Sequence, residues 1–341
     1  MPGFVTHYYF GQMTARQLTD KRSRHLIRDH REAFNLGLEG PDVFFYHIPC
    51  HFIGERNIGN VMHDTSVMMF FENLFNARNG LDDAMDRKIA DAYILGFIGH
   101  YTLDTNCHPY IFYRSNHLKA KATKGGTFDF GNHVTLETDI DHTVLRHYMH
   151  KSPTEFDYRD AVFVDGHELT VISELLESAI ANTYGENISA YRIASAIGSF
   201  TRLNRAMRDP YGIKKTGVRI AEDLIFGHSI ISAMIPSDNI VKFKDPCNLK
   251  HRKWHNPWNT ADESSKSVMD ILEDTVPTYE NRVNMYMDSI HATAEDSLND
   301  CLKKRNALLE ELSDLSYSTG LPLEDESEPD DDVDVKFEDE E

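Results

Sequence analysis

Two short series of histidine and carboxylate residues have the spacing of metal ligands. His100, Asp104 and His108 follow one another at intervals of four residues, and a second pair, His133 and Glu137, begins 25 residues after His108. On an α-helix this interval stacks side chains above one another on a single face. Two such helices facing each other would direct three imidazoles and two carboxylates at one point. The pattern indicates a site for more than one metal ion.

The first series continues a helix face that is expected to be buried. The small residues Ala92 and Gly96 precede His100 at the same interval. Two imidazoles and a carboxylate on such a face would be unfavourable by several kcal/mol unless a partner satisfies them. A divalent cation does so directly, and imidazole nitrogen with carboxylate oxygen is a ligand set that suits zinc. Spacing alone leaves a buried hydrogen-bond network as the alternative.

Helical periodicity extends along most of the chain. Apolar residues at helical spacing predict helices over residues 14–37, 63–78, 82–108, 133–148, 167–183, 189–207, 217–234 and 261–315. Thr14 is expected to cap the first of these helices, and Pro277 to break the last. Ala161–Val164 is the best candidate for a strand. We expect an all-α fold, with one multi-helix domain over residues 1–318, a metal cluster between its helices, and a tail over residues 319–341.

Negative charge is concentrated at the end of the chain. The formal net charge is -20, and residues 324–341 hold twelve acids and one lysine, which gives -11 for this segment and -9 for the rest. This composition predicts a disordered, solvating acidic tail whose partner is unknown. No basic stripe suited to nucleic-acid phosphates is present, so nucleic acid is not expected as a partner in the leading interpretation.

The cysteines and the hydropathy of the sequence indicate in which cellular compartment the protein resides. The four cysteines show no CxxC spacing, which favours reduced thiols. The sequence has no run of 18 apolar residues and no basic segment followed by an apolar one at its start. We therefore expect no transmembrane helix, no secretory signal, a cytoplasmic location and at most peripheral contact with membranes.

Taken in chain order, these and further motifs resemble the zinc-dependent phospholipase C family. The matching pieces are Thr6-His7, Gly40-Pro41-Asp42, Gly59 to His63, Gly96 to Tyr110, His133 to Glu137 and Asn248 to Trp258. The resemblance covers about residues 1–300, and the order of eight candidate ligands makes it specific.

The resemblance implies two or three zinc ions. One would be held by Asp42, His63, His100 and Asp104, and a second by His108, His133 and Glu137. The third would use His7 together with Asp104, which would bridge two ions. Relatives complete the third site with an N-terminal tryptophan. This sequence has no such residue, which leaves water, His47 or His51 to complete it.

The implied activity is hydrolysis of a phosphodiester, most simply cleavage of a phospholipid to diacylglycerol and a phosphorylated head group. Asp42 is expected to bind metal and to accept the proton of the attacking water. Irregular segments at 40–63 and 122–132 are expected to border the substrate mouth.

Two other functions stay open. One is a zinc nuclease or nucleotidase of the same superfamily, whose ligand set usually ends in aspartate where Glu137 stands. The acidic charge balance does not favour a polyanionic substrate. The other is a helical metal-binding protein without catalysis, in which no coordination position is open.

Overall fold

The computed structural model describes residues 3–45, 57–115, 127–164, 166–225, 231–238, 242–291 and 298–325. These parts of the chain are mostly helical, which confirms the predicted all-α class. The elements that position the site are α1 (Phe4–Gln17), α2 (Lys21–Asp29), α3 (Arg31–Gly37), η1 (Gly40–Phe44), α5 (Ile58–Asp64), α6 (Val67–Asn79), α7 (Ala84–Ser115) and α9 (Thr127–Val144). The remaining elements are η2 (Leu145–Met149), α10 (Arg159–Val162), α11 (Gly166–Tyr184), α12 (Ala190–Met207), α13 (Ile213–Ile225), α14 (Ile231–Met234), β1 (Trp254–Asn256), β2 (Asn259–Ser264), α15 (Val268–Ile290), α16 (Leu298–Leu312) and η3 (Leu323–Asp325).

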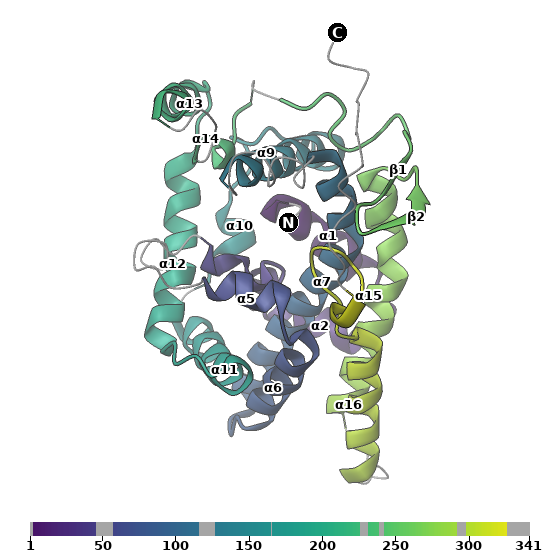
Figure 1. The fold of residues 1–341 in the computed structure, drawn as a ribbon. Coiled ribbons are helices and arrows are strands. Elements are labelled where there is room, and N and C mark those ends of the chain that lie inside the picture. Colours follow the sequence, from purple (N-terminus) through teal and green to yellow (C-terminus); the bar gives the residue numbers. More distant parts are fainter. Residues whose placement is uncertain are drawn as a thin grey trace.

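The long helix α7 is the buried axis of the molecule. Nearly all of its residues between Ile89 and Ile111 are buried, and α1, α3, α9 and α15 all pack against it. Figure 1 shows α7 in the middle of the ribbon, with α12 along one side and α15 along the other. A helix buried on all sides can carry polar side chains only where a partner satisfies them, so its His and Asp residues mark a site.

A pair of glycines allows α3 to cross α7 closely. A Cβ atom on Gly96 would lie 2.1 Å from the carbonyl oxygen of Phe34, and one on Gly37 would lie 2.1 Å from that of Tyr93. Any side chain at either position would therefore force the two backbones apart. This close crossing brings η1, which follows α3, against α7.

The first helix begins earlier than expected. It starts at Phe4, and Thr14 lies inside it, where the Thr14 hydroxyl donates to the carbonyl oxygen of Phe10 at 2.8 Å. The prediction that Thr14 caps a helix was therefore wrong, because its hydroxyl is satisfied within the preceding helical turn. Asp20 caps the next helix instead, accepting from the backbone N–H groups of Arg22 and Ser23.

Two other expectations about secondary structure were also wrong. Pro277 lies inside α15, and the interruption comes after Ile290 instead. Packing offsets the hydrogen bond that the proline removes, since Tyr279 is buried and donates to the carbonyl oxygen of Leu95 at 3.0 Å. The expected strand at 161–164 overlaps the short helix α10, and the strands that do form, β1 and β2, make an antiparallel hairpin.

The packed body continues past residue 318. Thr319 is buried, and its carbonyl oxygen accepts from Asn256 Nδ2 at 2.9 Å. The backbone N–H of Leu323 donates to the carbonyl oxygen of Asp314, also at 2.9 Å. The first part of the predicted tail therefore packs on the helical body, and residues 326–341 lie outside the described residues.

Among the described residues, none of the helices combines the length and the apolar character that crossing a bilayer requires.

Candidate metal centre

Helix α7 carries the ladder of ligands that the spacing predicts. His100, Asp104 and His108 are all buried. His100 Nε2 lies 3.2 Å from Asp104 Oδ2, and His108 Nδ1 lies 3.8 Å from the same oxygen. One carboxylate oxygen of Asp104 thus faces the imidazoles one helical turn before and after it.

Three elements from other parts of the chain surround Asp104. On α1, His7 Nε2 lies 3.1 Å from Asp104 Oδ1, the oxygen that faces away from His100. On α5, His63 Nε2 lies 3.2 Å from Oδ1 of Asp42, a residue of η1, and 3.8 Å from Asp104 Oδ2. His100 Nε2 is 4.0 Å from the same Asp42 oxygen. Asp104 therefore presents one oxygen to His7 and the other to His63 and His100.

A second cluster joins α7 to α9. His133 Nε2 lies 2.8 Å from Glu137 Oε1, and His108 Nε2 lies 3.9 Å from the same oxygen. The side chains of His108 and Glu137 are buried, and that of His133 is 12% exposed. The packing of α9 on α7 brings these three residues together.

Each of the eight candidate ligands belongs to a group of three residues that could hold a metal ion. Within each group, one ligand atom from every residue lies within 4.8 Å of the others, and the groups are His7/Asp42/His100, His63/His100/Asp104 and His108/His133/Glu137. The last group equals the set expected for the second ion. The first two groups both contain His100. The resemblance instead implies one ion at Asp42, His63, His100 and Asp104, and another at His7 and Asp104.

In three of the imidazoles, Nδ1 lies within hydrogen-bond distance of a backbone carbonyl oxygen. Nδ1 of His63 lies 2.7 Å from the carbonyl oxygen of Gly59, that of His100 3.0 Å from Leu38, and that of His108 2.6 Å from Tyr317. A carbonyl only accepts, so the proton of a neutral ring must sit on Nδ1. Nε2 of each ring is then left with a lone pair, as in metal-binding histidines.

Several nitrogen and oxygen atoms that face one another in the cluster have no hydrogen-bond partner among the described residues. Nε2 of His63, His100 and His108, Oδ1 of Asp42 and both oxygens of Asp104 are buried and make no hydrogen bond there. Such atoms are costly without a partner, and bound cations would satisfy all of them. Nitrogen and carboxylate ligands without thiolates suit zinc, so the residues fit the metal.

Charge within the cluster also favours cations. Burial works against ionisation of Asp104, but the imidazoles of His108, His100 and His7 hold its pKa well below the usual value. Burial lowers the pKa of His108 to about 4, which keeps this ring neutral and able to bind metal. Burial also lowers the pKa of His7. His100 differs, because burial opposes its protonation but the carboxylates of Asp104 and Asp42 raise its pKa. The anionic Asp104 carboxylate and the neutral imidazoles of His7 and His108 together favour a positive ion.

Gly40 explains the shape of the Gly-Pro-Asp turn. Its φ is 50°, and a Cβ atom there would lie 2.3 Å from Cδ2 of His100. Only glycine adopts this backbone conformation freely and leaves room for the imidazole. The turn then delivers Asp42 to the cluster.

Sequence reasoning missed Glu39, which lies three residues before Asp42. Its side chain is fully buried, and neither carboxylate oxygen has a hydrogen-bond partner within the described part of the chain. Burial, together with the charges of Asp42, Asp141 and Asp104, raises its pKa well above the usual value. An acid directly after the apolar stretch from Leu36 to Leu38, and only three residues before Asp42, was the available signal.

Sequence reasoning also missed Asp141, which continues the four-residue interval of His133 and Glu137 on α9. Its Oδ1 accepts from the backbone N–H of Thr6 at 2.9 Å and from the Thr6 hydroxyl at 2.6 Å, and its Oδ2 accepts from the backbone N–H of Val5 at 3.2 Å. The Val5 N–H is one of the donors that the first turn of α1 leaves without a backbone partner, whereas the Thr6 N–H also donates to the carbonyl oxygen of Gly3 at 2.9 Å. Asp141 thus fixes the start of α1, and with it the neighbouring His7.

Several expectations fall on residues that the structure does not describe. His47 and His51, proposed to complete a third site, lie in the undescribed segment 46–56. Parts of both expected mouth segments, at 40–63 and 122–132, lie outside the described residues too.

Comparison with known proteins identifies one family. A family model described as zinc dependent phospholipase C matches residues 6–192, which is more than half of the 341-residue chain and includes every candidate ligand. No curated protein and no solved structure matches the chain significantly.

Proposed function

Since the chain belongs to the zinc-dependent phospholipase C family, a family of phosphodiester-hydrolysing enzymes, we propose that it cleaves a phospholipid between phosphorus and the glycerol oxygen. The products are diacylglycerol and a phosphorylated head group. The observation that carries the proposal is the Asp104 carboxylate, whose two oxygens face imidazoles from three different helices, α1, α5 and α7.

The ligand assignment is part of the proposal. Asp42, His63, His100 and Asp104 would hold one zinc ion, His108, His133 and Glu137 would hold the second, and His7 with Asp104 would contribute to a third. Zinc, when bound, neutralises phosphate oxygens and makes water more acidic, which are the two requirements of this hydrolysis.

Asp42 acts as the general base. Its side chain is 4% exposed, and its Oδ1 lies 3.2 Å from His63 Nε2, so it is part of the cluster. Asp42 accepts a proton from water as the water oxygen bonds to phosphorus. The bond from phosphorus to the glycerol oxygen breaks, and that oxygen takes up a proton from solvent as diacylglycerol leaves, while Asp42 returns its proton to solvent.

Tyr317 shields and orients the histidines. It is buried, and its ring centroid lies 4.7 Å from that of His63 and 5.8 Å from that of His100. Its carbonyl oxygen also holds His108 Nδ1. One residue therefore excludes water from two imidazoles and fixes the direction of a third.

The test is release of head group from phospholipids. Zinc-loaded protein is incubated with lipids that differ in head group, and both diacylglycerol and phosphorylated head group are measured. Asp42→Asn should lose at least about 100-fold of the rate, since a positioned general base contributes about 100- to 10,000-fold. Asp29→Asn, at a carboxylate that is 56% exposed on α2, is the matched control and should retain it.

Two results would contradict the proposal. Hydrolysis of single-stranded nucleic acid or 3′-nucleotides, with no release from any lipid, would assign the site to the nuclease function. Zinc bound in the expected amount without hydrolysis of either class would make the chain a metal-binding protein without catalysis.

A further inference from the structure

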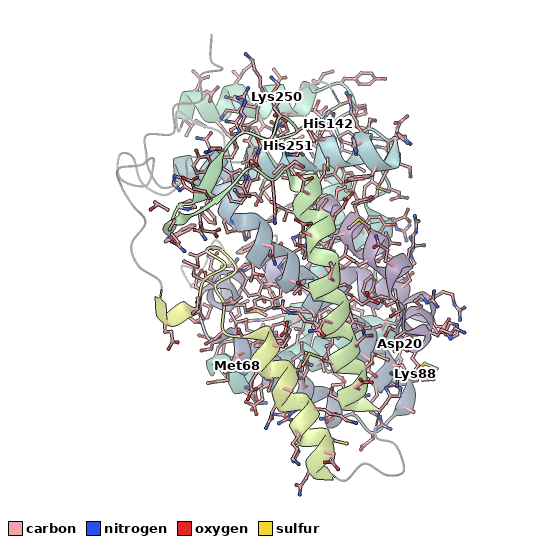
Figure 2. The ribbon with its side chains drawn as sticks, turned by 90° about the vertical axis from the view of Figure 1, so that its right-hand side faces the viewer. Asp20, Met68, Lys88, His142, Lys250 and His251 are labelled. Carbon is pink, nitrogen blue, oxygen red and sulfur yellow. The ribbon has the colours of Figure 1, made fainter. Side chains whose placement is uncertain are left out.

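The segment 242–253 has a charge opposite to that of the chain. Residues 242–253 contain five lysines or arginines and one acid, Asp245, in a protein whose net charge is -20. Lys250 and Lys253 are exposed. Figure 2 shows Lys250 and His251 at one end of the molecule, far from Lys88 and Asp20 in the other half.

The loop that carries these residues has a fixed backbone. Asp245, Asn248 and His251 all have φ between 51° and 55°, a conformation that non-glycine residues rarely adopt. The Asn248 side chain holds the loop closed, accepting from the backbone N–H of Arg252 at 3.0 Å and donating to its carbonyl oxygen at 2.9 Å. Several left-handed residues within one short loop persist only where surrounding contacts over-determine them, and such residues concentrate at functional segments.

The carboxylate of Asp245, the one acid in residues 242–253, accepts hydrogen bonds from the loop itself. The Asp245 carboxylate accepts from the backbone N–H groups of Leu249 at 2.6 Å and of Lys250 at 3.1 Å. The acid therefore shapes the loop from within. At the tip, Leu249 is 47% exposed between this turn and the exposed lysines. An apolar side chain next to cationic ones is the composition of segments that bind membrane surfaces.

The loop is joined to the ligand-bearing helix. Tyr110, two residues after His108 on α7, donates its hydroxyl to the carbonyl oxygen of Pro246 at 2.6 Å. The loop also contacts α9, since Lys242 Nζ donates to Oδ1 of Asn132, the residue before His133, at 2.6 Å. The basic loop therefore borders the side of the molecule where the His108/His133/Glu137 group lies.

We propose that residues 242–253 dock the protein onto an anionic phospholipid surface, with Leu249 entering the head-group layer and Lys250 and Lys253 contacting lipid phosphates. Charge complementarity carries this choice of partner, because a body with strong negative charge is repelled by such a surface unless a basic patch faces it. The inference deepens the proposed function, since it rests on a lipid substrate at the adjoining metal groups.

The test is binding of the full-length protein to vesicles, measured by co-sedimentation without any turnover. Vesicles of phosphatidylcholine alone are compared with vesicles of equimolar phosphatidylcholine and phosphatidylserine. The wild type should bind the anionic vesicles, and less so at high salt. The double variant Lys250→Glu/Lys253→Glu should bind at least about tenfold more weakly, because each basic residue at an anionic surface contributes severalfold. Leu249→Ser should also weaken binding.

Lys88→Glu provides the matched control. It introduces the same charge change at an exposed lysine in the half of the molecule away from the loop (Figure 2), and it should leave vesicle binding unchanged. Thermal melting of all variants should match that of the wild type. Hydrolysis of a short-chain, monomeric phospholipid should also be equal in all of them, since none alters a proposed ligand.

These readouts separate the two proposals. Loop-dependent vesicle binding without hydrolysis of any lipid would support the docking surface and refute the proposed function. Equal vesicle binding by the double variant and the wild type would overturn the docking proposal, as would equal wild-type binding to neutral and anionic vesicles. Binding of single-stranded RNA that the double variant loses, with no binding to vesicles, would assign the surface to nucleic acid and overturn it too.

Discussion

His7 Nε2 lies 3.1 Å from Asp104 Oδ1, although 96 residues separate the two in the sequence. This pairing connects the first helix of the chain to its central helix, and both side chains are fully buried. The second Asp104 oxygen lies 3.2 Å from His100 Nε2. In the proposed assignment Asp104 would contribute to two metal ions, so the part of the centre formed by His7, Asp42, His63 and His100 depends on it.

The anchor at Asp141 is expected to control the His7 position. Asp141→Ala removes the acceptor for the Val5 backbone N–H and for the Thr6 hydroxyl, both of which are buried, while the Thr6 backbone N–H keeps the carbonyl oxygen of Gly3. We expect the free energy of unfolding to fall by about 2 kcal/mol, together with loss of zinc from the group that contains His7. Urea unfolding and zinc analysis measure the two effects. Unchanged zinc content would show that α1 holds His7 without this anchor.

Acid should destabilise the metal-free protein through His108. Burial lowers the pKa of this imidazole from 6.5 to about 4 in the folded protein, so between these pH values only the unfolded chain binds the proton. The free energy of unfolding therefore falls as pH falls through this window, by at most about 3 kcal/mol. Unfolding of the zinc-stripped wild type and of His108→Asn, followed from pH 7 to pH 4, tests this. An equally steep fall in both proteins would assign the effect to other groups.

Glu39 should have the opposite pH dependence. Its pKa is raised by burial and by the neighbouring carboxylates, so folding disfavours its ionised form. Its contribution to stability is complete below the unfolded pKa of 4.5 and declines as pH rises above it, by at most about 1.4 kcal/mol for each pH unit. Glu39→Gln should therefore stabilise the zinc-stripped protein at pH 8 and change it little at pH 4. Thermal melting at both pH values measures the difference, and a gain of equal size at both would exclude ionisation as the cause.

Local spacing allowed much of the site to be predicted. The His100, Asp104 and His108 ladder and the His133 and Glu137 pair depend only on helix geometry, and both lie on helices. The resemblance supplied His7, Asp42 and His63, which come from segments that no local pattern would join. All eight lie together in the structure.

What the sequence left unpredicted depends on tertiary contacts. The local context of Glu39 and Asp141 shows where they lie but not what they contact, and their importance comes from burial beside residues distant in the chain. Pro277 was expected to end a helix, but the packing of α15 on α7 overrides the local preference. The fixed loop around Asn248 follows from side-chain hydrogen bonds that residue types alone do not specify.

Zinc analysis of the purified wild type and of Asp104→Asn tests the central claim most directly. The wild type should contain two or three zinc ions per chain. Asp104→Asn should keep only the ion held by His108, His133 and Glu137, and hydrolysis of phospholipid should fall at least about 100-fold. Absence of stoichiometric zinc in the wild type would contradict the account, as would a variant that keeps all its zinc and its activity.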